Sequence, residues 1–196
     1  TQTGSRQLEN ERAQRQPQRG AGSGRDAKYL AELAAKTHRI ENKIQIIAVE
    51  PASELSAIGK KTTQGLNVKW LEDSLPALIH VTKQEISFDL ILLSAVWMHI
   101  PPSDRARSMR KLANLLKPGG IIVISLRHGQ TEEECTQRKM HTVCADELKR
   151  LATNVGLITK LETPKEQDKL GRNHVLWQTV VMQMPDDDTE AFMIAY

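Results

Sequence analysis

Residues 88–126 read FDLILLSAVWMHIPPSDRARSMRKLANLLKPGGIIVISL, and this stretch decides the fold class. Its two ends, FDLILLS at 88–94 and IIVISL at 121–126, are almost continuously apolar, which is typical of strands covered by helices on both faces. The middle has helical spacing from Ser103 and Asp104, which can cap a helix, to Leu116, and the sequence KPGG at 117–120 predicts its end. A strand, a helix and a second strand in this order predict two parallel strands in one sheet.

Outward from this unit, helices and short apolar strands alternate in both directions. The upstream patterns predict helix 26–36, strand 44–49, helix 52–61, strand 67–71 and a helix over 74–81 capped by Ser74. Downstream, a helix at 145–154 precedes strands at 157–162 and 174–184, which have no helix between them and are expected to pair antiparallel. These units predict an α/β three-layer sandwich with a Rossmann-like, mostly parallel sheet and a C-terminal antiparallel hairpin.

The composition indicates one globular domain with short extensions. The chain has 196 residues, of which 39% are hydrophobic and 26% are charged. Residues 1–19 contain only Leu8 and Ala13 as apolar positions, so we predict a polar, flexible arm. The domain is expected over 20–185, followed by a tail at 186–196.

The charge distribution argues against several classes of partner. The first 28 residues carry the whole net charge of +3, with six Lys or Arg against three Asp or Glu, so the remaining body is neutral. A neutral body makes nucleic acid an unlikely partner. The apolar run at 88–100 is too short to span a bilayer, and no secretory leader is recognisable. Two cysteines indicate no disulfide framework, and we expect a cytoplasmic protein that acts on a small molecule, of open oligomeric state.

Three loops that follow strands or open helices carry candidate site residues, because α/β sheets bind ligands at the carboxyl ends of their strands. Gly20, Gly22 and Gly24 form a GxGxG loop before a helix, although a glycine-rich linker has the same composition. Glu50 ends the next strand, where a carboxylate can accept hydrogen bonds from both ribose hydroxyls, or be a surface charge. Asp73 and Ser74 follow the third strand, where Asp73 either borders a flat ring or stabilises a helix start.

Taken together, these segments resemble the class I S-adenosylmethionine-dependent methyltransferases from Gly20 to the C-terminal strand. The similar segments are GAGSGRDA at 20–27, AVEP at 48–51, WLEDSLPAL at 70–78, FDLILLSAVWMHIPP at 88–102 and LLKPGGIIVISLRHG at 115–129. The resemblance implies S-adenosylmethionine as cofactor and the sheet order 3-2-1-4-5-7-6 with strand 7 reversed. It also implies that Gly20, Gly22 and Gly24 border the methionine part of the cofactor, Glu50 the ribose, and Asp73 with Ser74 the adenine.

The segment before the glycine loop departs from the family pattern. The family has a buried apolar strand there, usually with an acidic residue two positions before the first glycine. Here residues 12–19 read RAQRQPQR, and Gln18 stands at the acidic position. Proline and polar side chains are badly placed in a central parallel strand, so we predict that residues 1–19 form no well-buried central strand.

The candidate catalytic and substrate residues lie near the ends of later strands. His99 is the first candidate for a base or a substrate contact, because imidazole titrates near neutral pH, although it can also cap the strand turn. Arg127, His128 and Arg172 are candidates for substrate contact, or face solvent. The spacing of Cys135, His141 and Cys144 does not indicate a metal site.

Three functions therefore remain open from the sequence. The first is a methyltransferase that uses S-adenosylmethionine and a small-molecule acceptor. The second is a catalytically impaired, methyltransferase-like binding or scaffold module, motivated by the missing first strand. The third is a Rossmann-type nucleotide-binding oxidoreductase, which shares the glycine loop and Glu50 but not the LKPGG motif or the closing hairpin.

Overall fold

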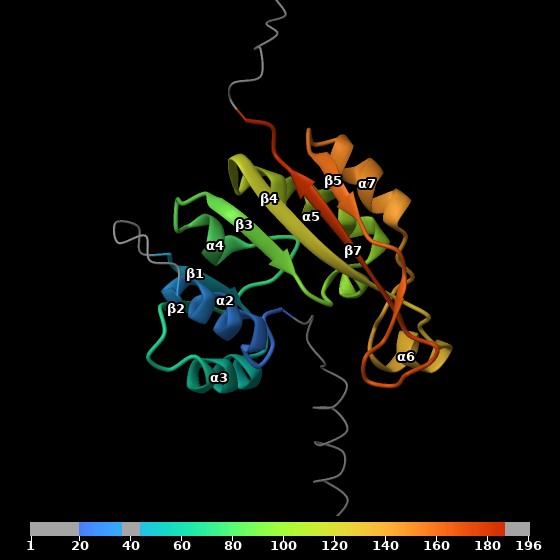
Figure 1. Cartoon of the computed structure of the whole chain (residues 1–196), viewed down its shortest axis with the longest axis horizontal. Coiled ribbons are helices and arrows are strands. Elements are labelled where there is room, and N and C mark those ends of the chain that lie inside the picture. The colour runs from blue at the N-terminus through green and yellow to red at the C-terminus, as the bar shows by residue number, and fades with distance from the viewer. Residues whose placement is uncertain (1–19, 37–43, 187–196) are drawn as a thin grey trace, which may run out of the picture.

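The computed structural model describes residues 20–36 and 44–186. The predicted arm at 1–19 lies outside the described residues, and so does the predicted tail apart from Asp186. The described chain is an α/β structure with a mixed sheet, which confirms the predicted fold class (Figure 1).

The strands form two separate sheets. Strand β1 (Ile46–Val49) pairs in parallel with β2 (Val68–Leu71). The larger sheet has the order β3-β4-β7-β5, and the short β6 also pairs with β7. Its strands are β3 (Phe88–Leu93), β4 (Leu116–His128), β5 (Ile158–Glu162), β6 (Glu166–Gln167) and β7 (Leu176–Gln183). Strand β7 runs antiparallel to β4, β5 and β6, as expected of the terminal hairpin.

Helices cover one face of the larger sheet. Helices α5 (Pro102–Asn114) and α7 (Ala145–Thr153) contact each other and pack on β4 and β5 respectively (Figure 1). Met109 of α5, Leu148 of α7 and Ile122 of β4 are fully buried in this core. Helices α2 (Arg25–Lys36) and α3 (Ser53–Thr62) lie beside the small β1–β2 sheet instead.

Strand β4 begins earlier than its sequence predicts, which corrects the boundary of helix α5. The helix ends at Asn114, and residues 117–120, interpreted above as the stop signal, lie within β4. Phe88 of β3 pairs with Leu116, and its N–H donates to the Leu115 carbonyl over 2.8 Å. Pairing with β3 therefore draws this polar segment into the sheet. The start of the helix also differs from the prediction. Pro102 is the first helical residue, Pro101 stands at the N-cap position, and no described side chain caps the helix.

The predicted helix at 74–81 is also corrected. Only the four-residue α4 (Ile79–Thr82) is helical, and Leu78 before it has a left-handed backbone with φ of 45°. The Asp73 carboxylate accepts hydrogen bonds from the N–H groups of Ser74, Ile79 and Val81, so the intervening residues wrap around it. The Asp73 carboxylate, which lies outside the helix, thus caps the helix in place of Ser74. Three further elements were not predicted, η1 (Trp97–His99), α6 (Glu132–Gln137) and the two-residue strand β6.

Candidate functional site

The Glu50 carboxylate holds the glycine loop at the carboxyl end of β1. Its Oε2 accepts hydrogen bonds from the N–H groups of Gly20 and Gly22, over 2.9 and 2.8 Å, and its Oε1 accepts one from Ala52 over 3.0 Å. The loop is tied down further by the Ala21 N–H, which donates to the Val49 carbonyl over 2.7 Å. Glu50 is completely buried, so it is not a surface charge. The structure therefore brings together two features that lie 28 to 30 residues apart in the chain.

The first two glycines of the loop have different spatial requirements. A Cβ on Gly20 would lie 2.1 Å from the Val49 carbonyl oxygen, so only glycine allows this close approach of the loop to β1. Gly22 has a φ of +57° and no heavy atom within 4 Å of where its Cβ would be. The space over Gly22 is open to a ligand.

Gly24, the third glycine of the motif, is buried against helix α3. Its Cβ would lie 3.1 Å from both the Gly59 Cα and the Trp70 indole. That indole occupies the space that a side chain at Gly59 would fill, and its Nε1 donates to the Thr63 hydroxyl over 3.0 Å. In the structure Gly24 thus serves the packing of α2 on α3 and β2.

Asp26 connects the start of helix α2 to the end of β3. It lies two residues after the loop and forms a hydrogen bond with Ser94, which directly follows β3. Partial burial opposes its ionisation, but the hydrogen bonds from Arg25 and Ser94 outweigh it and hold the pKa of Asp26 below its ordinary value. Sequence reasoning missed this residue, although it stands inside the quoted GAGSGRDA segment.

Asp73 and Ser74 lie in the loop between β2 and α4. The three N–H groups described above occupy the Asp73 carboxylate, and one of them belongs to Ser74. Asp73 therefore stabilises the start of a helix, which is one of the two roles considered from the sequence. The helix in question is α4, which begins six residues after Asp73.

His99 lies in η1, which follows the carboxyl end of β3. It is 8% exposed, and its N–H donates to the Val96 carbonyl over 2.9 Å. The neighbouring Met98 carbonyl accepts a hydrogen bond from the His141 N–H over 2.7 Å, which ties η1 to the loop before α7. Trp97 is fully buried, and its indole N–H has no hydrogen-bond partner among the described residues.

Arg127, at the carboxyl end of β4, is buried and already paired. Its Nη2 donates to the Glu134 carboxylate over 2.6 Å, and its side chain is 3% exposed. The Arg127 guanidinium lowers the pKa of Glu134 below its ordinary value despite the opposing effect of desolvation. A capping box with Thr131 at the start of α6 orients Glu134 for this contact. Sequence reasoning missed Glu134.

His128 and Arg172 are also engaged within the chain. His128 is half-buried with its Nε2 3.0 Å from the Gln178 side-chain oxygen, and burial together with nearby Lys165 lowers the pKa of His128. Arg172 makes a two-point contact with the Asp168 carboxylate, over 2.9 Å at each point. This contact, with a hydrogen bond from Trp177, holds the pKa of Asp168 far below its usual value. Sequence reasoning missed Asp168, although its position four residues before Arg172 could have indicated this ion pair.

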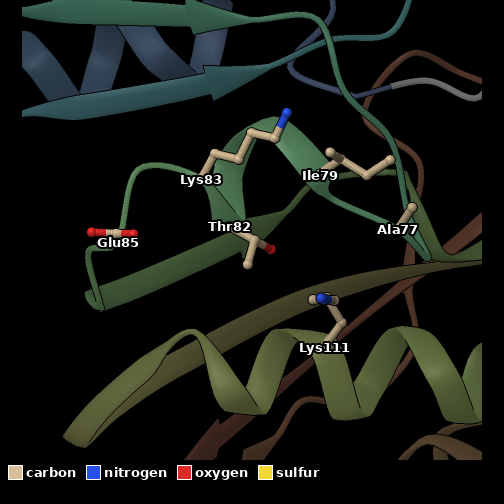
Figure 2. A pocket seen from close by; sticks show the side chains of 6 residues that line it. All are labelled: Ala77, Ile79, Thr82, Lys83, Glu85 and Lys111. Carbon is tan, nitrogen blue, oxygen red and sulfur yellow. The ribbon is translucent and has the colours of Figure 1, made fainter.

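A separate surface pocket of about 420 Å³ lies between α4 and α5 (Figure 2). Two lysines, one glutamate and three smaller side chains line it, and it contains none of the loop residues: Ala77, Ile79, Thr82, Lys83, Glu85 and Lys111. None of the described helices is long and apolar enough to cross a membrane.

Comparison with known proteins connects the loop to a family. A family model described as a methyltransferase domain matches residues 18–120, just over half of the chain. No curated protein matches the chain significantly.

Solved structures share the fold. The chain is similar to a SAM-dependent methyltransferase from Methanosarcina mazei, with 15% identity, coverage of 87% of this chain and 95% of that chain, and a TM-score of 0.63. It is similar to the N-methyltransferase NodS from Bradyrhizobium japonicum in complex with S-adenosyl-L-homocysteine, with 12% identity, 84% and 74% coverage, and a TM-score of 0.61. It is also similar to the [4+2]-cyclase SpnF, with 15% identity, 85% and 74% coverage, and a TM-score of 0.60. Identities this low show a common fold alone.

Proposed function

The chain belongs to the methyltransferase domain family, with the class I S-adenosylmethionine-binding fold, and on that premise we propose that it methylates a small-molecule acceptor in the cytoplasm. The observation that carries the proposal is the glycine loop, held against β1 by the buried Glu50 carboxylate through Gly20 and Gly22. Two backbone N–H groups of the loop donate to this one buried acid, which fixes the shape of the loop beside the open space over Gly22.

The residues present fit the adenosyl part of S-adenosylmethionine. The space over Gly22 is open, so a ligand can approach the backbone closely there. A carboxylate has about four acceptor positions, and the described hydrogen bonds of Glu50 use three. Because the side chain is completely buried, we propose that one ribose hydroxyl takes the fourth position when the glycine loop that covers it shifts on binding. This differs from the expectation that Glu50 binds both hydroxyls, because two positions serve the loop itself.

When bound, the cofactor supplies a methyl group made electrophilic by its positively charged sulfur. The chain's own residues then have to orient the acceptor and remove its proton. We assign the proton removal to His99, in η1 beside the end of β3. Asp26 and Ser94 are placed to border the cofactor between the loop and that strand end.

The proposed substrate residues take a modified role. Arg127 and Arg172 each have a carboxylate partner, so we propose that Arg127, His128 and Arg172 shape the acceptor side of the site rather than bind a substrate anion. The loop at Met140 and His141 joins Arg127 to η1, since the Met140 sulfur lies 3.5 Å from Arg127 Nη1 and His141 is bonded to Met98.

A second candidate is a binding module that does not catalyse methyl transfer. The structure favours this candidate in one respect, because β1 and β3 belong to separate sheets among the described residues. A strand that joined them would hold the glycine loop rigidly toward its ligand. The third function considered, a nucleotide-binding oxidoreductase, finds no support in the family to which the chain belongs.

Calorimetry with S-adenosylmethionine, S-adenosylhomocysteine and NAD separates these functions. We expect both adenosyl compounds to bind and NAD not to bind. Binding of NAD alone would contradict the proposal, and binding of none of the three would favour the non-catalytic module. The variant Glu132→Ala, which changes an exposed residue of α6, serves as a control and should bind as the parent does.

A further inference from the structure

Helix η1 carries the proposed base, His99, and is too short to fix its own position. The His99 N–H donates to the Val96 carbonyl over 2.9 Å, and the Ile100 N–H donates to the Trp97 carbonyl over 3.1 Å. Short 3₁₀-helices have poor hydrogen-bond geometry, so these two bonds alone do not set how η1 lies on the sheet. A base must nevertheless lie within hydrogen-bond reach of the proton that it removes. Contacts from other parts of the chain therefore have to position η1.

A buried arginine of helix α5 contacts the carbonyl group that directly follows His99. Arg105 is 2% exposed, and its Nε donates to the Ile100 carbonyl over 3.2 Å. Its Nη1 donates to the Glu147 carboxylate of α7 over 2.6 Å, and its Nη2 donates to the Thr142 carbonyl over 2.8 Å. One side chain of α5 thus connects η1, the loop before α7, and α7 itself.

The loop before α7 contacts η1 on the other side of His99. The His141 N–H donates to the Met98 carbonyl over 2.7 Å, and the residue after His141 is the one whose carbonyl accepts from Arg105. Met98 and Ile100, the two neighbours of His99, are both buried. Each is therefore tied to the same connected group of hydrogen bonds, with Arg105 at its centre.

The chemistry of the guanidinium group explains why an arginine stands at this buried position. A buried charge costs free energy unless it is paired and hydrogen-bonded, so an apolar residue would join α5 to α7 at lower cost. A guanidinium, however, presents its N–H donors in a rigid plane, and here its three nitrogens bind three acceptors on different segments. Two of these acceptors are backbone carbonyls in loops. Lysine keeps the charge but not this planar arrangement of donors.

We propose that Arg105 is a positioning residue that fixes η1, and with it His99, at the acceptor side of the site. This role rests on the proposed function, since His99 acts as a base only if the chain transfers a methyl group. Among the described residues, the hydrogen bonds of Arg105 reach neither the glycine loop nor Glu50. A change at Arg105 should therefore act on the acceptor side and leave cofactor binding as it is.

The charge-matched variant Arg105→Lys tests this role in the full chain by nuclear magnetic resonance and hydrogen exchange. We expect the ring signals of His99 to move, because η1 loses an anchor while the buried charge stays. The His99 and Ile100 amides should exchange about tenfold faster than in the parent. Arg110→Lys, at an exposed position of the same helix, should leave both measurements unchanged. Unchanged ring signals and exchange rates in Arg105→Lys would overturn the proposal.

A measurement on the parent chain needs no variant at position 105. The Nε–H proton of Arg105 should exchange with water at least about tenfold more slowly than that of the exposed Arg110, because it is buried and bonded to the Ile100 carbonyl. Equal exchange of the two protons would show that Arg105 does not hold η1, and would also overturn the proposal.

Two further variants separate positioning from a general loss of stability. Leu148→Ala removes buried contacts of α7 and should lower the melting temperature without moving the His99 ring signals. Glu147→Gln keeps an oxygen acceptor for Arg105 and should also leave these signals in place. If Leu148→Ala moved them as far as Arg105→Lys does, at an equal loss of melting temperature, Arg105 would act through stability alone and the proposal would be wrong.

Calorimetry with S-adenosylhomocysteine distinguishes a failure of this proposal from a failure of the proposed function. We expect the parent and Arg105→Lys to bind it with affinities within about twofold of each other, because Arg105 has no described contact with the glycine loop. A parent that does not bind it would contradict the proposed function. Binding by the parent, combined with unmoved His99 signals in Arg105→Lys, would overturn only the role of Arg105.

Discussion

At the scale of single residues, Glu50 has two roles that one substitution affects together. We expect Glu50→Ala to weaken S-adenosylmethionine binding by about 1 to 3 kcal/mol through loss of charge-assisted hydrogen bonds. It should also lower the melting temperature, because Gly20, Gly22 and Ala52 lose a buried acceptor. A surface charge, the alternative that the sequence left open, would have little effect on the fold when removed, but Glu50 is completely buried.

A cofactor analogue without ribose hydroxyls separates the two roles of Glu50. If Glu50 contacts the ribose, calorimetry will show a larger loss of affinity in Glu50→Ala for S-adenosylhomocysteine than for its 2′,3′-dideoxy analogue. An equal loss for the two compounds would mean that the carboxylate only positions the loop.

Arg127 and Glu134 form a buried ion pair whose two members are not equivalent. Arg127 is 3% exposed and Glu134 is 20% exposed. Removing Glu134 leaves a buried positive charge without its main partner, so Glu134→Ala should lower the free energy of unfolding by about 3 kcal/mol in urea titration. The double variant Arg127→Met with Glu134→Ala should recover most of this loss, whereas the exposed control Glu132→Ala should change little. A loss in the double variant as large as in the single one would show that the Arg127 charge is not the cause.

At the scale of elements, the packing of α3 depends on the absence of a side chain at Gly59. Glycine within a helix usually costs about 1 kcal/mol relative to alanine, so Gly59→Ala would stabilise an isolated α3. Here a Cβ would lie 2.0 Å from the Trp70 indole, and the clash outweighs the gain in helix propensity. We expect a net destabilisation of about 1 to 3 kcal/mol, measured by thermal unfolding.

A variant with a smaller side chain in place of Trp70 tests whether the clash with the indole causes this destabilisation. In a Trp70→Leu background, Gly59→Ala should be much less destabilising than in the parent chain, because the indole ring is gone. The same loss in both backgrounds would place the effect in α3 itself rather than in its contact with β2.

At the scale of the whole molecule, the two sheets differ in how strongly they are held. Strand β4 is paired on both sides by β3 and β7 and lies over a large buried core, whereas β1 has one paired edge in the described structure. We therefore expect the Ala48 amide to exchange faster than the Val123 amide by about tenfold or more.

Cofactor binding should reduce this difference, because the loop joins β1 to the site and a ligand stabilises the state that binds it. Exchange measured with and without S-adenosylhomocysteine checks this, and the Val180 amide of β7 serves as the internal reference. A cofactor that binds without slowing exchange at Ala48 would separate the β1–β2 sheet from the binding event.

The sequence by itself determined the order and kind of most elements. The apolar runs at 88–94 and 121–126 predict β3 and β4 because strands covered by helices must be apolar throughout. The absence of a helix between the last two long strands predicted their antiparallel pairing. Polar residues at 12–19 predict that no apolar strand precedes the loop, and this segment lies outside the described residues. These are local properties, since burial and turn formation depend on residues close together in the chain.

Only the tertiary structure decided what the candidate residues touch. Glu50 ends a strand, as predicted, but its carboxylate meets N–H groups 28 and 30 residues away. Arg127 finds its partner in a helix that the sequence did not indicate, and Asp73 takes the capping role expected of Ser74. A side chain's hydrogen-bond partners depend on which distant segments the fold places around it, and no pattern within one segment encodes that arrangement.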